Sequence, residues 1–150
     1  MQKRKHSGVT LVPILALVTL FTGCSTFNRD WQAAAKLPAP AGSIEGAWDG
    51  TWKSDHNGHN GNLRAIITRV DANTYQARFR AKYMTVLSFG QETRLTGTKA
   101  GNAHEFAGQN DLGKAYGGIY YYQGNATPER FFSTYKCSID HGTFQMTRPK

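Results

Sequence analysis

Apolar and polar residues alternate strictly along much of the chain beyond residue 44. The alternation is clearest over 75–83, where an aromatic residue or alanine stands at every second position. These residues are Tyr75, Ala77, Phe79, Ala81 and Tyr83, and those between them are glutamine or basic residues. Successive side chains of a β-strand point to opposite faces, so a period of two places one set in a core and the other in water. The segment is therefore predicted to be a half-buried strand.

Eight runs of this kind follow one another, and segments rich in Gly, Asn and Asp separate them. The runs span residues 44–53, 62–70, 75–83, 87–98, 103–109, 115–123, 130–138 and 142–148. Connections this short make each strand antiparallel to its predecessor, and a long meander removes its exposed edges by closing on itself. We predict an all-β domain over 44–150, a single antiparallel eight-stranded up-and-down barrel. A two-sheet β-sandwich satisfies the same alternation and is the alternative.

The composition agrees with a domain of this class. The 150 residues include 16 Gly, eight Phe, seven Tyr and three Trp, a balance that favours strands and tight turns over helices. A hydrophobic content of 39% fits one soluble domain and excludes both a disordered chain and a multi-span membrane protein.

Residues 1–23 have the organisation of an export signal. Lys3, Arg4 and Lys5 precede an apolar stretch over 9–21 that is too short to span a bilayer permanently. The sequence Leu20-Phe21-Thr22-Gly23-Cys24 resembles a bacterial lipobox, although Phe21 stands where an aliphatic residue is usual. The resemblance implies that the Cys24 thiol takes a diacylglyceryl group and that Cys24 becomes the mature N-terminus. An ordinary secretory peptide with an incidental cysteine is the alternative.

Lipidation at Cys24 has consequences for charge, redox state and location. Removal of three basic and no acidic residues lowers the formal net charge from +8 to +5. Cys137 then has no intramolecular disulfide partner, and its place in an alternating run predicts a small buried filler. Ser25 stands where Asp would resemble an inner-membrane retention signal, so the resemblance implies a lipid anchor in the outer membrane, facing the periplasm. An exported protein of this kind is not expected to bind nucleic acid.

Residues 24–43 are predicted to be a flexible tether between the anchor and the barrel. They show no sustained amphipathic period, and Pro38 and Pro40 lie near their end. Trp31 lies within this tether, where it is either an interfacial anchor or a tolerated exposed side chain.

The start of the first run carries a further resemblance. Gly46-Ala47-Trp48 is similar to the Gly-x-Trp motif that opens the barrel of lipocalins and related calycins. This resemblance implies an up-and-down barrel in which a basic residue near the end, here Arg148, packs across Trp48. The wider pattern of Gly, Trp and His-Gly motifs also resembles small exported bacterial lipoproteins of uncharacterised function, a resemblance that supplies no chemistry.

Two functions are consistent with these features. The first is a membrane-anchored envelope lipoprotein whose barrel interior binds a small apolar or amphipathic molecule. The residues expected to wall that interior are Trp48, Trp52, Tyr75, Phe79, Tyr83 and Phe106. The alternative is a solid-core structural or interaction lipoprotein that contacts another envelope component. No nucleophile motif, phosphate loop or paired cysteine motif is present, so the sequence predicts neither an enzyme nor a cofactor.

One polar constellation follows from the predicted topology. In an up-and-down barrel the first and seventh connections lie at the same end, which would bring Asp55, His56 and His59 close to Asp140 and His141. Their spacing matches no standard metal site, and Gly and Asn flank the histidines, as in polar turns. We therefore predict a cluster of turns and no metal site.

Overall fold

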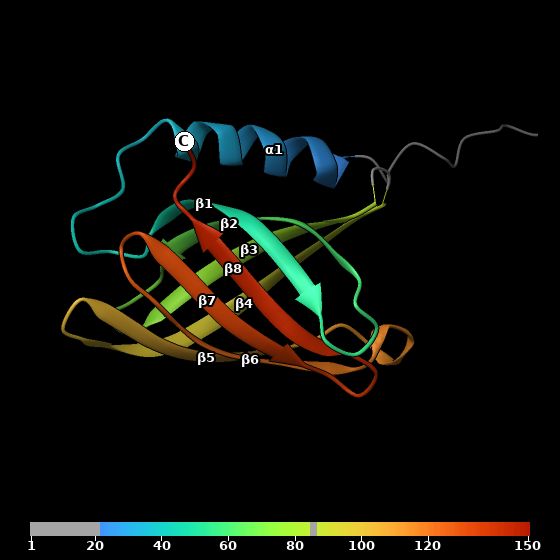
Figure 1. Cartoon of the computed structure of the whole chain (residues 1–150). Coiled ribbons are helices and arrows are strands. Elements are labelled where there is room, and N and C mark those ends of the chain that lie inside the picture. Colours follow the sequence, from blue (N-terminus) through green and yellow to red (C-terminus); the bar gives the residue numbers. More distant parts are fainter. Residues whose placement is uncertain (1–21, 85–86) are drawn as a thin grey trace, which may run out of the picture.

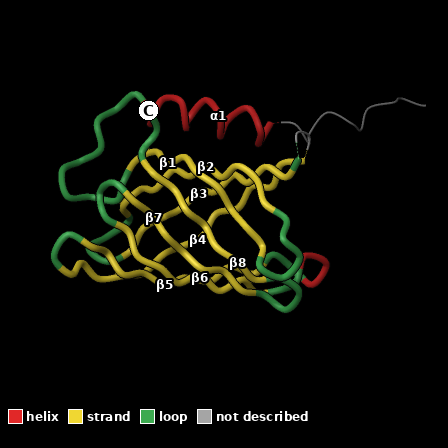
Figure 2. Tube along the Cα trace, viewed as in Figure 1, coloured by secondary structure: helices red, strands yellow, loops and turns green. Residues whose placement is uncertain are grey.

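The computed structural model describes residues 22–84 and 87–150. Eight strands form one closed barrel in which each is antiparallel to its predecessor (Figures 1 and 2). The elements are α1 (Thr22–Ala35), β1 (Gly46–Ser54), β2 (Asn60–Arg69), β3 (Thr74–Tyr83), β4 (Leu87–Ala100), β5 (Ala103–Asp111), the short 3₁₀ helix η1 (Lys114–Tyr116), β6 (Ile119–Ala126), β7 (Arg130–Lys136) and β8 (His141–Thr147). The prediction of an all-β, eight-stranded up-and-down barrel is confirmed, and the sandwich alternative is not.

The barrel closes between β1 and β8, which pair from Asp49 with Thr147 to Ser54 with Gly142. Gly50 lies in this seam, where a Cβ atom would collide with the backbone carbonyl of Gln145. The close approach explains a glycine within a strand.

The alternation observed in the sequence places one set of side chains inside the barrel. Leu63, Ala65 and Ile67 of β2 face inward, as do Phe131 and Tyr135 of β7, and all are buried. The barrel has two different ends. One end carries the connections β1–β2, β3–β4, β5–β6 and β7–β8 and is called the open end, because the interior cavity reaches the surface there. Residues 43–45 lie across the opposite end, which is called the closed end.

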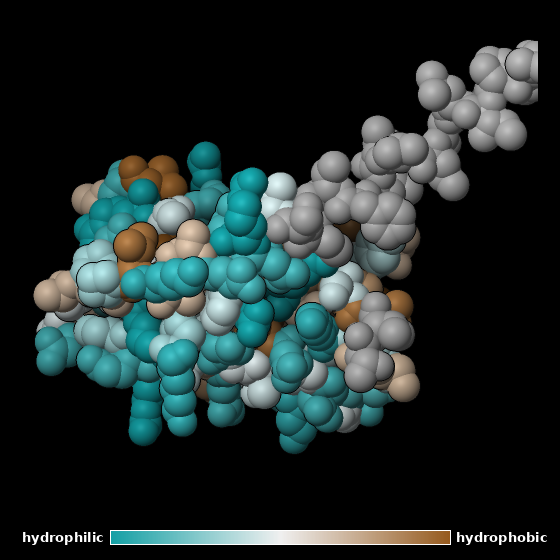
Figure 3. Space-filling model, turned by 90° about the horizontal axis from the view of Figure 1, so that it is seen from above, coloured by the Kyte–Doolittle hydropathy of each residue, from teal (hydrophilic) through white to brown (hydrophobic). Residues whose placement is uncertain are grey.

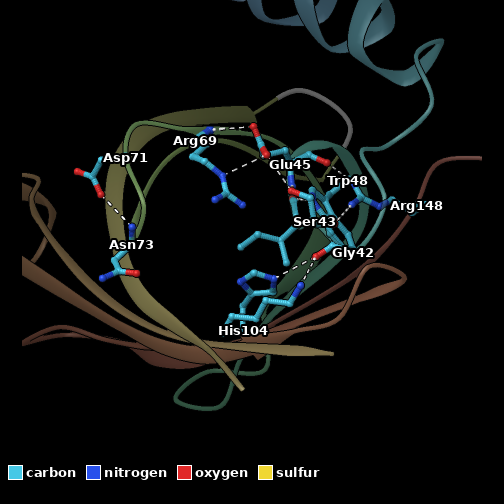
Figure 4. A network of polar contacts seen from close by, with 11 residues as sticks. Gly42, Ser43, Glu45, Trp48, Arg69, Asp71, Asn73, His104 and Arg148 are labelled. Carbon is cyan, nitrogen blue, oxygen red and sulfur yellow. Dashed lines mark hydrogen bonds and ion pairs between the residues drawn. The ribbon is translucent and has the colours of Figure 1, made fainter. Parts of the chain in front are cut away.

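Trp48 and Arg148 seal the closed end. The Arg148 guanidinium carbon lies 3.9 Å from the centre of the Trp48 ring, so the packing that the calycin resemblance implied is confirmed. The same guanidinium donates hydrogen bonds to the carbonyls of Ser43 (2.9 Å) and Glu45 (2.8 Å) (Figure 4). It also donates one to the carbonyl of Pro128 (2.7 Å). One side chain thus ties the segment before β1 and the β6–β7 connection to the end of β8.

The expectation of a flexible tether over 24–43 is wrong for its first part, because Thr22–Ala35 forms α1. The apolar residues Phe27, Trp31, Ala34 and Ala35 stand at positions i, i+4, i+7 and i+8 and make a helical stripe that our reading of the sequence missed. This stripe packs on the outer face of β1 and β2. The surface on the α1 side of the molecule is mainly hydrophilic (Figure 3).

Trp31 is buried in this interface and is neither a membrane anchor nor an exposed residue. Its indole Nε1 donates a hydrogen bond to the Trp48 carbonyl (2.9 Å), and the Arg64 guanidinium stacks 4.0 Å above its ring. Arg78 of β3 forms an ion pair with Asp30 of the helix (3.1 Å). Helix α1 is thereby fixed to three strands, and an irregular segment over 36–45 connects it to β1.

Two local predictions also differ from the structure. The run expected over 115–123 begins as a strand only at Ile119, because Gly117 and Gly118 adopt positive φ angles of 96° and 74° after η1. Cys137 lies just beyond the end of β7 and is half-buried, so it is not a core filler.

The predicted signal peptide falls almost wholly on residues 1–21, which lie outside the described residues, while Cys24 is in the first turn of α1. Among the residues described, no helix has the length and apolar character needed to cross a membrane.

Candidate ligand-binding cavity

A cavity of about 820 Å³ occupies the half of the barrel interior next to the open end. Its wall includes Trp52, Leu63, Phe79, Tyr83, Tyr122 and Phe144. The volume falls within the range of roughly 300–1,000 Å³ that is usual for small-molecule sites. The lining is dominated by aromatic and aliphatic side chains.

The strand period explains how these side chains reach the cavity. Phe79, Ala81 and Tyr83 occupy alternate positions of β3 and all line the wall, and Tyr120 and Tyr122 do the same on β6. Ala81 contributes only a methyl group between two aromatic rings. A small residue at that position leaves space that a larger side chain would fill.

The six residues predicted to wall the interior divide between the two halves of the barrel. Trp52, Phe79 and Tyr83 line the cavity. Trp48, Tyr75 and Phe106 lie in the closed half, where they pack against other buried side chains. The Phe106 ring, for example, stacks on that of Phe131 with their centres 4.8 Å apart. The structure thus places only half of the predicted set at the cavity.

Reading the sequence did not select Tyr120, Tyr122, Tyr135 or Phe144, although all four line the cavity. The available signal was alternation within the runs that became β6, β7 and β8. That signal marks inward-facing residues but does not show which of them border a void.

Tyr122 carries the most informative polar group of the cavity. Its ring is 2% exposed, and its hydroxyl is buried without a hydrogen-bond partner. Burial raises the pKa of Tyr122; Gln91 acts in the opposite direction, but its geometry is not that of a hydrogen bond. An unsatisfied buried hydroxyl costs about 1–3 kcal/mol. Because the hydroxyl is itself buried, it can donate a hydrogen bond to a ligand only after a neighbouring side chain moves aside.

Asp140, in contrast, is fully engaged at the edge of the cavity. Its carboxylate accepts hydrogen bonds from the Ser54 hydroxyl (2.6 Å), the Tyr135 hydroxyl (3.0 Å) and the His141 backbone N–H (2.8 Å). Burial and the negative charge of Asp140 raise the pKa of Tyr135. These bonds join β1, β7 and the β7–β8 connection, so Asp140 has a structural role in the cavity wall.

The predicted meeting of the first and seventh connections is confirmed. The Asp55 N–H donates to the His141 carbonyl (2.9 Å), and the rings of His56 and His141 are 6.2 Å apart. His59 instead contacts Tyr83 at 4.7 Å, at the rim of the cavity. Over residues 22–84 and 87–150, no three His, Cys, Asp or Glu side chains are arranged to hold a metal ion. All three imidazoles are exposed.

Comparison of this chain with protein-family models, with curated proteins and with solved structures finds no match. Its cavity and its barrel geometry are therefore the basis for assigning a function.

Proposed function

We propose that the protein is a membrane-anchored lipoprotein of the bacterial cell envelope and that its barrel binds a small amphipathic molecule. The observation that supports this most is a cavity of about 820 Å³ walled by aromatic and aliphatic side chains. Apolar pockets with a few polar groups that fix orientation are typical of small-molecule sites.

The cavity favours a particular ligand chemistry. Leu63 and Phe79 at its inner part suit a flexible apolar chain or a ring system. Once a neighbouring side chain moves aside, the buried Tyr122 hydroxyl would donate a hydrogen bond to an ester, ether or carbonyl oxygen of that molecule. The carboxylate of Asp140, at the edge of the cavity, makes this part of the wall unfavourable for an anionic group. The expected ligand has an uncharged, hydrogen-bond-accepting middle and a long apolar part.

The support for a lipid anchor at Cys24 comes from the sequence. A lipid on Cys24 would hold the N-terminus of α1 at the bilayer, and Ser25 favours the outer membrane, with the barrel in the periplasm. The solid-core alternative, a lipoprotein that only contacts another envelope component, is less consistent with a cavity of about 820 Å³.

Binding of N-phenylnaphthylamine, an apolar dye that fluoresces in dry pockets, tests this proposal. The full chain, kept in solution by a non-micellar amphipathic polymer, should bind the dye saturably at one site. Ala81→Trp should weaken dye binding because the added indole occupies part of the cavity between Phe79 and Tyr83. Tyr121→Trp is the matched control, since Tyr121 points outward from β6 and is 55% exposed. Undiminished dye binding by Ala81→Trp would contradict the proposal.

A further inference from the structure

Large apolar side chains are exposed together at the open end of the barrel. Met84, Leu87 and Phe89 belong to the β3–β4 hairpin, Tyr116 to η1, and Ile139 to the β7–β8 connection. Each is at least 48% exposed. Solvated hairpin tips are normally polar, and exposed apolar groups that gather in one region mark an interaction site.

These side chains are continuous with the cavity. Phe89, Tyr116 and Ile139 also line it, so they form its rim. Met84 has a φ angle of +53°, which is uncommon for a residue other than glycine, and its side chain is 70% exposed. The hairpin therefore presents a methionine to solvent at a conformational cost, a pattern that occurs at functional sites.

The charges around this rim are mainly positive. Lys53, Lys82, Lys114 and Lys136 are all exposed at the open end. Asp55 and Asp111 are the exposed carboxylates among the described residues of the same end. Apolar side chains surrounded by lysines are suited to the surface of an anionic bilayer, where the lysines meet headgroups and the apolar side chains enter the interfacial region.

Helix α1 directs the N-terminus to the same end. Its C-terminal residues Ala34 and Ala35 lie beside Gly46 and Arg148 at the closed end. Earlier in the helix, Phe27 lies under the Arg78 guanidinium, midway along β3. The helix thus begins toward the open end (Figure 1). A lipid at Cys24, about one turn before Phe27, would emerge on the side of the cavity mouth.

We infer that the open end of the barrel is a docking surface for an anionic phospholipid bilayer, so that the cavity opens directly onto the membrane and takes its ligand from it. This inference rests on the anchor in the proposed function. The docked orientation places the closed end, with Trp48 and Arg148, away from the bilayer.

Fluorescent labels at two matched positions test this orientation. Leu87→Cys lies at the rim and Val70→Cys in the β2–β3 connection of the closed end, and the native side chains are 48% and 52% exposed. Each is made in a Cys137→Ser background, labelled with an environment-sensitive dye, and the full chain is reconstituted in vesicles of phosphatidylglycerol and phosphatidylcholine. Brominated lipid should quench the label at 87 several-fold more than the label at 70.

Further variants and outcomes separate the possible explanations. Lys82→Glu with Lys114→Glu should reduce quenching at 87 in anionic vesicles, because the headgroups then repel the rim. Equal quenching at 87 and 70 would overturn the inference. Shielding of 87 only after an envelope protein extract is added would also overturn it, in favour of a protein partner.

The proposed function can fail separately from the orientation. If Cys24 carries no lipid, the mass of the N-terminal peptide shows it. If the barrel binds no ligand, the titration with N-phenylnaphthylamine shows it. The quenching comparison is repeated with Cys24→Ser, which lacks the lipid, and only the vesicle-bound fraction is measured. A difference between 87 and 70 in both forms is the expected result.

Discussion

Replacement of Trp48 by alanine should destabilise the barrel strongly while leaving the cavity intact. Trp48 is fully buried, contacts Phe131 at a ring distance of 5.8 Å, and stacks under Arg148. Its indole N–H donates a hydrogen bond of 2.9 Å to the Ile44 carbonyl. The substitution removes all of these contacts at the closed end, and no cavity-lining residue changes.

The magnitude follows from these contacts. Truncation of a buried tryptophan to alanine costs about 3–5 kcal/mol in a protein core. Loss of the donor for Ile44 adds about 1 kcal/mol. Because small domains are stable by about 5–15 kcal/mol, the variant should retain only part of its stability. With a urea dependence of roughly 1–3 kcal/mol per molar, the unfolding midpoint should fall by more than about 1 M.

Urea unfolding followed by far-ultraviolet circular dichroism measures this loss without relying on tryptophan fluorescence. Trp52→Ala is the matched control, because Trp52 lies on the same strand and inward face but is only half-buried and lines the cavity. It should lose about 1–2 kcal/mol and bind N-phenylnaphthylamine more weakly. Trp48→Ala should keep dye binding without denaturant. Equal destabilisation by the two variants would refute the division into a packed closed end and an open cavity.

Three further predictions concern the anchor, the helix and the polar wall of the cavity. Cys24→Ser should abolish incorporation of radiolabelled fatty acid; equal labelling of the wild type and the variant would exclude lipidation at this residue. Trp31→Ala should increase amide hydrogen exchange in α1 while the strand amides stay protected, because the indole holds the helix to the barrel. The folded state holds the phenolic proton of Tyr135 more tightly than the unfolded state, because its pKa is raised on folding. This contribution to stability is complete below pH 10.0, the ordinary pKa of tyrosine, and is lost as the pH rises above that value. Unfolding midpoints should therefore drop in that range, and less so in Asp140→Asn, where burial still raises this pKa but the added effect of the Asp140 charge is absent.

Alternation along the chain was sufficient to predict the barrel. The side-chain period is a local property of a strand, so Tyr75 to Tyr83 could be assigned to two faces without a partner. Short turns then made each strand antiparallel to its neighbour, and this parity brought Asp55 and His141 to one end. The packing of Arg148 across Trp48, in contrast, was expected only from the resemblance of Gly46-Ala47-Trp48 to the lipocalin motif.

Helix α1 was missed although its signal was present. Phe27 and Trp31, with two alanines a turn later, form a stripe only one helix face wide, and helices of this length gain most of their stability from tertiary packing. The strip formed by Ala47 and Ile66 that receives them lies on the outer face of the barrel, which the strand pattern alone assigns to solvent.

Strand period and turn length were enough to assign most of the inward-facing side chains, because both are local properties of the chain. That Trp48 and Phe106 fill one half of the barrel while Trp52 and Phe79 border a void is visible only in three dimensions. A void depends on which side chains meet across the barrel, and therefore on the register between strands far apart in the chain. The unpartnered hydroxyl of Tyr122 is a result of the same kind, since a missing hydrogen bond is a property of its surroundings and is not encoded at any single position.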